Sequence, residues 1–264
     1  MDRSSIATKY AIDAAEIARH VELAKRSRAS VTQEFVVAEA GVSYSLKVER
    51  EGVGPLKTVY GRFQHFSFKV SDTWEKYSAL VRAPIDDSFQ PTFDYSRPIR
   101  LRIDSGCETG QLLGDLTCEC RGQLDLALDQ IAQSGQGVLI NIPRQDGRGM
   151  GLPFKLATLY LQAALGVDTV EAGSLLEPDG SRDIRTYSGV VAILMSLGVS
   201  TEATLELSSN NPSKVKIFAD NGYSRLSMVP CAVAPTEHTR QHLIAKQREL
   251  GHIGLVADAG EGGV

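Results

Sequence analysis

Three cysteines in one short segment, Cys107, Cys118 and Cys120, constrain the fold of this chain more than any other feature of its sequence. A fold that brings their thiolates together creates a metal site one ligand short of a closed structural zinc cage. Such a site keeps a fourth position for water, which is the arrangement of catalytic zinc. The segment therefore favours a hydrolytic enzyme, and three unrelated buried thiols are the alternative at this point.

A disulfide between Cys118 and Cys120 is disfavoured, because the single residue between them would leave a strained ring. Nothing at the N-terminus resembles a secretory signal that would deliver the chain to an oxidising compartment. Cys231 stands in the stretch Val-Pro-Cys-Ala-Val and is expected to be an ordinary buried residue.

The composition predicts a cytoplasmic protein without a membrane span. The 264 residues are 42% hydrophobic and carry a formal charge of −4, and no apolar run is long enough to cross a bilayer. A slightly acidic chain without a basic tail or repeat has no electrostatic reason to bind a nucleic acid polymer. An anionic ligand would therefore have to meet a local cluster of cations.

The hydrophobic pattern predicts a β-rich first part and an alternating second part, with one amphipathic helix at residues 4–27. Strands are expected between residues 31 and 104, with loops at 52–55 and 84–98. The later elements are expected to be a helix to about residue 135, a strand at 138–142, a helix at 152–165, a helix at 190–197, a strand at 203–207, a helix at 212–220 and a helix at 236–250. The fold class is therefore α+β, or mixed α/β.

The segment Ser209–Lys214 has the character of an anion site. A strand ends, Asn211 can cap a helix, and Pro212 takes its first position, so that free N–H groups point outward. Lys214 falls in the first turn, where the helix dipole disfavours a cation unless an anion is bound. A solvated lysine on a well-capped helix is the alternative.

A glycine-rich turn follows the strand that ends near residue 142. Its two arginines, Arg144 and Arg148, are spaced to clamp phosphate oxygens while the glycines allow close backbone approach. An ordinary turn with surface arginines is the alternative. Residues 183–185 are expected to open another helix, where a first-turn aspartate beside a solvated arginine is the alternative.

Together and in this order, these segments resemble the GTP cyclohydrolase II family of riboflavin biosynthesis. The matching stretches are residues 102–110, 118–123, 144–152, 168–172, 183–185, 209–214 and 251–252. The resemblance covers about residues 58–254, which would form the catalytic domain. It leaves residues 1–57 as an N-terminal extension of helix and strands, and residues 255–264 as a disordered tail.

The resemblance implies a zinc enzyme that opens the imidazole ring of GTP at C8 and releases formate and pyrophosphate, leaving a diaminopyrimidine ribosylamino phosphate. Its zinc ligands would be Cys107, Cys118 and Cys120, magnesium would share the charge of the triphosphate, and the enzyme would be a homodimer. The substrate contacts that it implies are Arg102, Ile103, Asp104, Ser105, Gly106, Gln123, Asp146, Gly147, Arg148, Thr169, Ser209 and Lys214.

The family's roles divide these contacts between the two ends of the nucleotide. Gln123 and Asp146 would read the purine, whereas Arg102, Arg148 and Lys214 would hold the triphosphate.

The resemblance also implies catalytic residues. The position of Arg185 is proposed in the family as a nucleophile toward the α-phosphate, with that of Asp183 as its proton acceptor. Because arginine is essentially never deprotonated in proteins, stabilisation of the departing pyrophosphate is the less demanding role for Arg185.

A family tyrosine assists the later, deformylating step, and either Tyr160 or Leu159 takes its place here. Tyr160 is expected to face the site, because deformylation needs a hydroxyl that can donate to the formamide.

Departures from the family's usual residues leave alternatives open. If Leu159 faces the site, a divergent paralogue could stop at the formamidopyrimidine nucleotide, or it could act on another purine nucleotide. A non-catalytic, zinc-containing nucleotide-binding protein is a further alternative. A zinc nucleobase deaminase is disfavoured because its His-x-Glu and Pro-Cys-x-x-Cys signatures are absent. The departures stand at Asp104, Gly106, Gln111, Arg121, Asp146 and Ser209.

Overall fold

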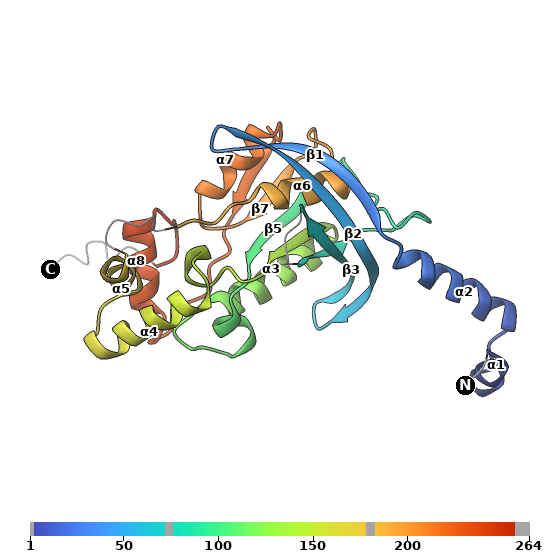
Figure 1. Ribbon diagram of the computed structural model, residues 1–264, viewed down its shortest axis with the longest axis horizontal. Coiled ribbons are helices and arrows are strands. Elements are labelled where there is room, and N and C mark those ends of the chain that lie inside the picture. The colour runs from blue at the N-terminus through green and yellow to red at the C-terminus, as the bar shows by residue number, and fades with distance from the viewer. Residues whose placement is uncertain (1–2, 72–75, 178–182, 257–264) are drawn as a thin grey trace.

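The computed structural model describes residues 3–71, 76–177 and 183–256 (Figure 1). The first part holds α1 (Arg3–Tyr10), α2 (Ala14–Ser27), β1 (Val31–Glu39), β2 (Val42–Thr58), β3 (Gly61–Val70), β4 (Lys76–Arg82), β5 (Ile99–Ser105) and η1 (Glu108–Leu112). The second part holds α3 (Cys120–Ser134), β6 (Gly137–Ile142), η2 (Asp146–Gly149), α4 (Leu152–Leu165), α5 (Thr169–Leu176), α6 (Ser188–Ser196), β7 (Leu205–Ser208), α7 (Ser213–Asp220), β8 (Leu226–Val229) and α8 (Arg240–Leu250). The fold is α+β, as the sequence predicts.

One sheet of eight strands organises the chain, in the order β1-β2-β3-β4-β6-β5-β7-β8. Strands β1 to β4 pair antiparallel, β6 joins β4 antiparallel, and β6, β5, β7 and β8 run parallel to one another. Short connections suffice for the antiparallel strands, whereas the parallel strands need helical crossovers. The β-rich and alternating halves of the sequence thus become the antiparallel and parallel halves of one strongly curled sheet (Figure 1).

Helices α3 and α6 cover opposite faces of this sheet. Successive side chains of a strand point to opposite faces, so Leu139 and Ile140 on β6 belong to separate apolar clusters. Ile140 lies in the larger cluster, to which α6 contributes fully buried residues such as Val191 and Ile193. Leu139 packs in the smaller cluster with Ile131 of α3. Strand β6 is thus buried on both faces, as is usual for parallel strands.

Two helices replace the single N-terminal helix that the sequence predicts. The chain turns at Ala11, which has a φ of 52°, and the carboxylate of Asp13 accepts hydrogen bonds from the N–H groups of Ala15 and Glu16. This capping starts a new helix, α2, and explains why the periodic pattern does not give one helix. Both α1 and α2 project from the sheet, at the end away from α4, α5 and α8 (Figure 1).

Two further expectations about local structure are wrong, and the start of the last helix is shifted. Residues 52–55 form no loop, because a register shift between Arg50 and Gly52 lets β2 continue and pair with β3. Residues 183–185 open no helix, since α6 begins at Ser188. The last helix starts at Arg240 rather than 236, because Thr236 and Thr239 bond each other's backbone N–H before it.

The proposed boundary at residue 57 falls at the end of β2, and both β1 and β2 belong to the same sheet as the remaining strands. The division into extension and catalytic domain stays a prediction. At the other end, Leu255 is buried and its N–H donates to Gln247, while residues 257–264 of the expected tail lie outside the described residues. No helix within the described ranges combines the length and apolar character that a bilayer span requires.

The parallel strands place three of the segments singled out by the sequence at one edge of the sheet. Strand β5 lies between β6 and β7, and the carboxyl ends of these three parallel strands point the same way. Cys107 follows β5, the turn with Arg148 follows β6, and Ser209 follows β7. In open parallel sheets, this edge is where ligands bind.

Candidate active site

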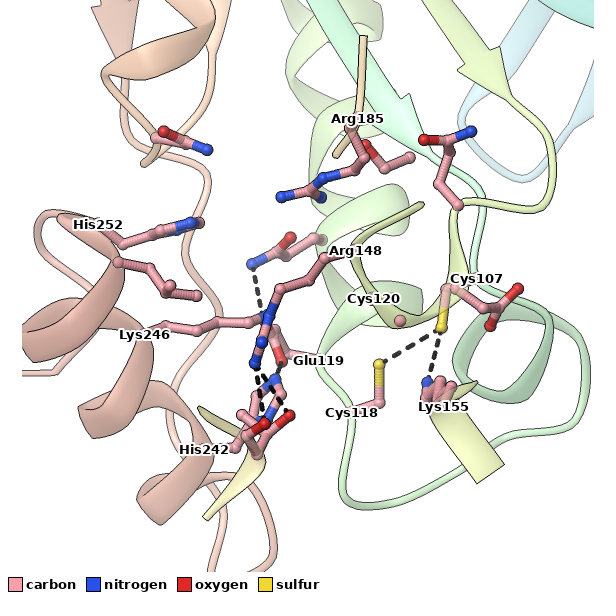
Figure 2. A pocket seen from close by; sticks show the side chains of 18 of the residues that line it. Cys107, Cys118, Glu119, Cys120, Arg148, Lys155, Arg185, His242, Lys246 and His252 are labelled. Atoms are coloured by element: carbon pink, nitrogen blue, oxygen red, sulfur yellow. Dashed lines mark hydrogen bonds and ion pairs between the residues drawn. The ribbon is translucent and has the colours of Figure 1, made fainter. Parts of the chain in front are cut away.

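A cavity opens at this edge and collects most of the predicted site residues (Figure 2). Its walls come from the segments after β5, β6 and β7, from α3 and α4, and from α8 with the residues that follow it. The predicted site residues that line it are Arg102, Asp104, Ser105, Cys107, Cys118, Cys120, Gln123, Asp146, Gly147, Arg148, Thr169, Arg185, Ser209 and Lys214.

Four predicted residues do not line the cavity directly. Ile103 is buried beneath it and presents its backbone oxygen to the Lys214 ammonium at 3.2 Å. Gly106 leaves no room for a side chain, because a Cβ there would lie 2.7 Å from the Ile142 carbonyl oxygen. Asp183 supports Arg185, and Tyr160 points elsewhere, as described below.

The three predicted metal ligands form one cluster. The Sγ atoms of Cys107, Cys118 and Cys120 all lie within 4.8 Å of one another, and those of Cys107 and Cys118 are 3.7 Å apart. Two thiolates bound tetrahedrally to zinc at about 2.3 Å would be roughly 3.8 Å apart. Gly110 permits this approach, since a Cβ at that position would lie 2.7 Å from the Cys118 Sγ. The donor set and its spacing fit a zinc ion.

The surroundings of the cluster favour negative charge on one sulfur, that of Cys107. Hydrogen bonds from the other two thiols, together with the Lys155 ammonium 3.0 Å away, hold the pKa of Cys107 far below its usual range. The hydrogen bond to Cys107 raises the pKa of Cys118 to about 11, and the pKa of Cys120 is also raised. Burial lowers the pKa of Lys155, but the neighbouring sulfurs outweigh it and raise the pKa. A metal ion would displace the protons that Cys118 and Cys120 retain.

A second group of charges in the same cavity contains three cations, Arg102, Arg185 and Lys214, with Asp104 3.6 Å from Arg102. Lys214 is 6% exposed, and burial lowers its pKa well below the usual value, with repulsion from Arg102 and Arg185 adding to the effect. Arg102 donates to the Ser208 carbonyl oxygen at 3.1 Å, while its Nε has no hydrogen-bond partner among the described residues. Buried cations that repel one another form a site that an anion would stabilise.

Arg185 is held at this cluster by Asp183. Its Nε donates to Asp183 Oδ1 at 2.8 Å, and Nη2 is also paired with the carboxylate. Burial raises the pKa of Asp183, but the hydrogen bonds and charge of Arg185 outweigh it and lower the pKa. Burial opposes the charge of Arg185, yet Asp183 raises its pKa above the usual value. The guanidinium therefore stays protonated.

Arg148 reaches the cavity from the turn after β6. Gly147 and Arg148 both have positive φ, at 59° and 61°, and Nη2 of Arg148 donates to the backbone oxygen and hydroxyl of Thr169. Thr169 is fixed in turn because Asp168 caps α5. Arg144 is exposed and is not among the lining residues, so the expected clamp by two arginines of this turn is wrong.

Two of the departures from the family pattern, Asp104 and Gln111, are hydrogen-bonded to each other. The buried carboxylate of Asp104 accepts from the Gln111 side chain at 2.9 and 3.0 Å and from Asn141 at 2.7 Å. Asp146, also buried, accepts from the Glu108 N–H at 3.1 Å. Both carboxylates are thus fixed by protein donors at the cavity wall.

The family of this chain follows from comparison with known sequences. The profile of the GTP cyclohydrolase II family matches residues 49–225. This chain belongs to the GTP cyclohydrolase II family. It is accordingly a hydrolase of the GTP cyclohydrolase II type.

Similar proteins share this membership. GTP cyclohydrolase-2 of Streptomyces coelicolor is 34% identical over 223 residues, which are 84% of this chain and 94% of that protein. GTP cyclohydrolase-2 of Shewanella piezotolerans is 35% identical over 198 residues, or 75% and 89% of the two chains. Riboflavin biosynthesis protein RibBA of Bacillus subtilis is 32% identical over 239 residues, 90% of this chain but only 56% of that protein.

A solved structure of RibBX, a two-domain 3,4-dihydroxy-2-butanone 4-phosphate synthase from A. baumannii, aligns with 71% of this chain and 40% of its own. Its TM-score is 0.36 and its identity 15%, so this likeness carries no argument about the fold or the function of this chain.

Helix α4 decides between the two candidates for the position of the GTP cyclohydrolase II tyrosine. Lys155, Thr158, Leu159 and Gln162 line the cavity, which is the spacing of one helix face. Tyr160 lies about 100° further around the helix and is 73% exposed. The expectation that Tyr160 faces the cavity is wrong, because the face that packs inward is the one that carries Lys155.

Sequence reasoning missed one wall of the cavity. His242, Lys246 and Leu250 of α8 line it, and Glu119 lines it between two of the cysteines. The polar positions of α8 resemble those of any surface helix, so no sequence signal marks them. His252 also lines the cavity, and, like Glu119, it lies in a stretch matching the GTP cyclohydrolase II family.

Proposed function

We propose that this chain opens the imidazole ring of GTP by zinc-dependent hydrolysis at C8 and releases pyrophosphate, within riboflavin biosynthesis. One observation carries the proposal: a single cavity holds a cluster of three thiols that fits zinc together with buried, mutually repelling cations. A purine nucleoside triphosphate has a ring to hydrolyse at one end and a polyanion at the other. The thiol cluster with its metal would act on the ring, and the cations would bind the polyanion.

The residues of the metal end have distinct tasks in this proposal. Cys107, Cys118 and Cys120 would hold zinc, which would supply an activated water at the position that three thiolates leave open. Lys155, 3.0 Å from the Cys107 sulfur, balances the negative charge of the thiolates. Gln123, which also lines the cavity, supplies amide donor and acceptor groups for the edge of the purine.

The cations hold the triphosphate and stabilise the charge of the departing pyrophosphate. The phosphate oxygens are bound by Lys214, Arg102 and Arg148, and magnesium would share in neutralising the negative charge of the triphosphate. Arg185 acts as an electrostatic stabiliser rather than as a nucleophile, because its hydrogen bond with the Asp183 carboxylate raises its pKa and keeps the guanidinium protonated.

The presence of Leu159 at the cavity favours a second outcome, in which the ring is opened but the product is not deformylated. An aliphatic side chain at this place has no hydroxyl with which to assist hydrolysis of the formamide. Thr158 carries the one hydroxyl on the inward face of α4, and this hydroxyl donates to the Lys155 carbonyl oxygen at 2.7 Å. The reaction would then stop at the formamidopyrimidine nucleotide, and the formyl group would stay on the product.

Incubation of the purified protein with GTP and magnesium tests both outcomes. Pyrophosphate, formate and the mass of the nucleotide product are measured in the same reaction. Pyrophosphate with formate supports complete turnover, whereas ring-opened product that retains the formyl mass supports the shorter reaction. Intact GTP bound to zinc-loaded protein without any product would overturn the enzymatic proposal in favour of a binding protein. The cytoplasmic location, which the composition predicts, and the homodimer, which the family resemblance implies, stay predictions.

A further inference from the structure

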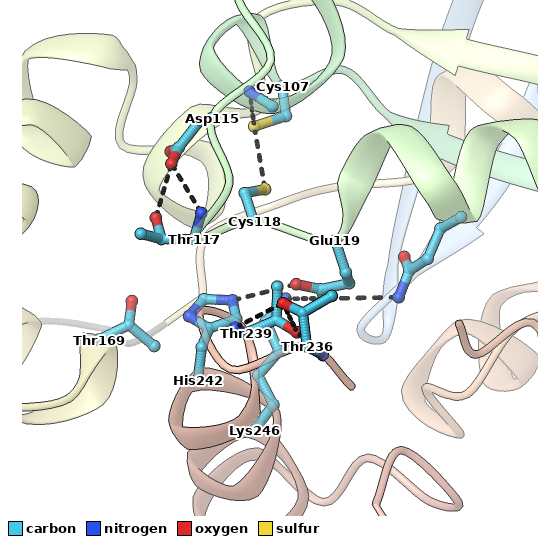
Figure 3. Close-up of polar contacts among 12 residues, drawn as sticks. Cys107, Asp115, Thr117, Cys118, Glu119, Thr169, Thr236, Thr239, His242 and Lys246 are labelled. Carbon is cyan, nitrogen blue, oxygen red and sulfur yellow. Dashed lines mark hydrogen bonds and ion pairs between the residues drawn. The ribbon is translucent and has the colours of Figure 1, made fainter. Parts of the chain in front are cut away.

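A buried ion pair joins the C-terminal helix to the segment Cys118–Cys120, here called the metal loop. The Glu119 side chain is 1% exposed, and one of its oxygens lies 2.5 Å from the Lys246 ammonium of α8 (Figure 3). Its other oxygen lies 3.5 Å from Nε2 of His242, one turn earlier on α8. Nothing in the proposed chemistry above uses this pair, although all three residues line the cavity.

The place of Glu119 makes its support consequential. Its neighbours in the chain on both sides are cysteines of the thiol cluster, so the Glu119 carboxylate and two of the three sulfurs belong to the same short loop. The Gln123 side chain donates to the same Glu119 oxygen at 3.4 Å, and Gln123 also accepts from Arg102. Movement of Glu119 would therefore disturb both the thiol geometry and a side chain on the base-binding side.

The far end of the C-terminal segment is fastened independently. Beyond α8, the Ile253 N–H donates to the Asn210 carbonyl oxygen at 2.9 Å, and the Asn210 side chain donates to the Ile253 carbonyl oxygen at 2.7 Å. Asn210 belongs to the segment after β7 that leads to Lys214. The C-terminal segment thus spans the cavity from the metal loop to the cationic end.

Charge balance gives the pair a function beyond attachment. Zinc with three thiolates has a net charge of −1, and a carboxylate between two of the ligands adds a second negative charge. Lys155 lies beside Cys107, and Lys246 is the corresponding cation beside Glu119. Without Lys246, a buried carboxylate next to an anionic metal centre would have lost its nearest cation, which favours opening of the loop.

We propose that Lys246 is a positioning residue for the metal loop: through its ion pair with Glu119, it holds Cys118 and Cys120 in metal-binding geometry and closes the cavity with α8. This inference rests on the proposed zinc site. Residues outside the coordination shell that support the metal ligands typically change metal affinity roughly 10- to 100-fold when they are replaced.

Zinc retention tests the inference without reference to turnover. Zinc-loaded protein is mixed with a chromophoric chelator, and the rate of zinc transfer is compared among Lys246→Met, Lys246→Arg, Glu119→Gln and the double variant Glu119→Gln/Lys246→Met. Lys216→Met is the matched control, because Lys216 forms an exposed ion pair with Asp220 on α7. Circular dichroism and melting temperature are recorded for each.

Lys246→Met is expected to lose zinc at least about tenfold faster than the wild type, whereas Lys246→Arg keeps the charge and is expected to lose zinc more slowly than Lys246→Met. The double variant is expected to lose zinc more slowly than Lys246→Met, since no uncompensated carboxylate is left. If Lys246→Met does not fold, faster zinc loss from folded Glu119→Gln carries the same test from the other partner.

Wild-type zinc retention in Lys246→Met or Glu119→Gln would overturn the inference, as would fully additive effects of the two substitutions. Zinc-binding wild type that does not convert GTP would overturn the proposed function and leave the inference standing. Wild type that binds no zinc would overturn both.

Discussion

Replacement of Lys214 by methionine is expected to stabilise the ligand-free protein while it removes activity. The ammonium is buried, it lies near Arg102 and Arg185, and it stands in the first turn of α7, where the helix dipole also disfavours a cation. These costs disappear with a side chain of similar length and no charge. The proposed triphosphate site would lose one of its cations at the same time.

The expected magnitude follows from opposing contributions. Replacement of buried ion pairs or triads by apolar side chains of similar volume often gains roughly 1–4 kcal/mol, and the same range is taken for Lys214 because its burial and the two neighbouring arginines oppose its charge. Methionine forfeits the hydrogen bond to the Ile103 oxygen and the contact with the Tyr187 ring at 5.3 Å, which together are worth about 1–2 kcal/mol. The centres of these two ranges leave a net gain of about 1 kcal/mol, which corresponds to a rise in melting temperature of roughly 2–4 °C for a chain of this size.

The pH dependence has a definite sign. Because the pKa of Lys214 is lower in the folded protein than in the unfolded chain, the unfolded state binds more protons between the two pKa values. Wild-type stability therefore rises with pH through this window, and the advantage of Lys214→Met shrinks as the pH approaches about 10.4.

Differential scanning fluorimetry without nucleotide, at neutral and at alkaline pH, measures these changes. Lys216→Met on the same helix is the control, and its exposed pair with Asp220 predicts almost no shift. The pyrophosphate release of Lys214→Met is expected to fall roughly 10²- to 10³-fold. A ligand-free Lys214→Met protein that melts below the wild type would refute the account of Lys214 as a strained cation.

Three further predictions concern the metal, the pyrophosphate and the product. Wild-type protein should carry about one zinc per chain, and Cys118→Ser should lose it, as atomic emission of purified protein would reveal. Arg185→Ala should reduce pyrophosphate release roughly 10²- to 10³-fold without loss of the fold; near-normal release would remove Arg185 from the mechanism. Tyr160→Phe should leave the product mass unchanged, whereas Leu159→Tyr should increase the share of formate released. A change of product in Tyr160→Phe would show that the exposed tyrosine acts after all.

The sequence determined much of the local structure because period and punctuation act over short distances. The segment Leu152–Leu165 is the helix that its pattern predicts, and the strand at 138–142 is β6 with one more residue at its start. The pattern failed where a single residue outweighs it, as Asp13 does when its carboxylate starts a second N-terminal helix. The short elements α5 and β8 were not anticipated from the hydrophobic pattern.

Residue types and their order also indicated the chemistry of the site. Cysteines that share a short segment can meet through local structure, and η1 with Gly110 brings Cys107 to Cys118. The convergence of Arg148, Arg185 and Lys214 on one cavity was an expectation from the family resemblance. Their physical meeting depends on the adjacency of β5, β6 and β7, which pairs residues far apart in the chain.

Only the tertiary structure decided which faces and which distant elements complete the cavity. A helix pattern does not fix its rotation against a neighbour to within one residue, so the packing of α4 determined that Leu159 and not Tyr160 lines the cavity. The pairing of Lys246 with Glu119 joins residues 127 positions apart, and no local rule anticipates such a contact. Side-chain contacts of this kind arise from packing of the whole chain, which is why the sequence alone left the wall formed by α8 unassigned.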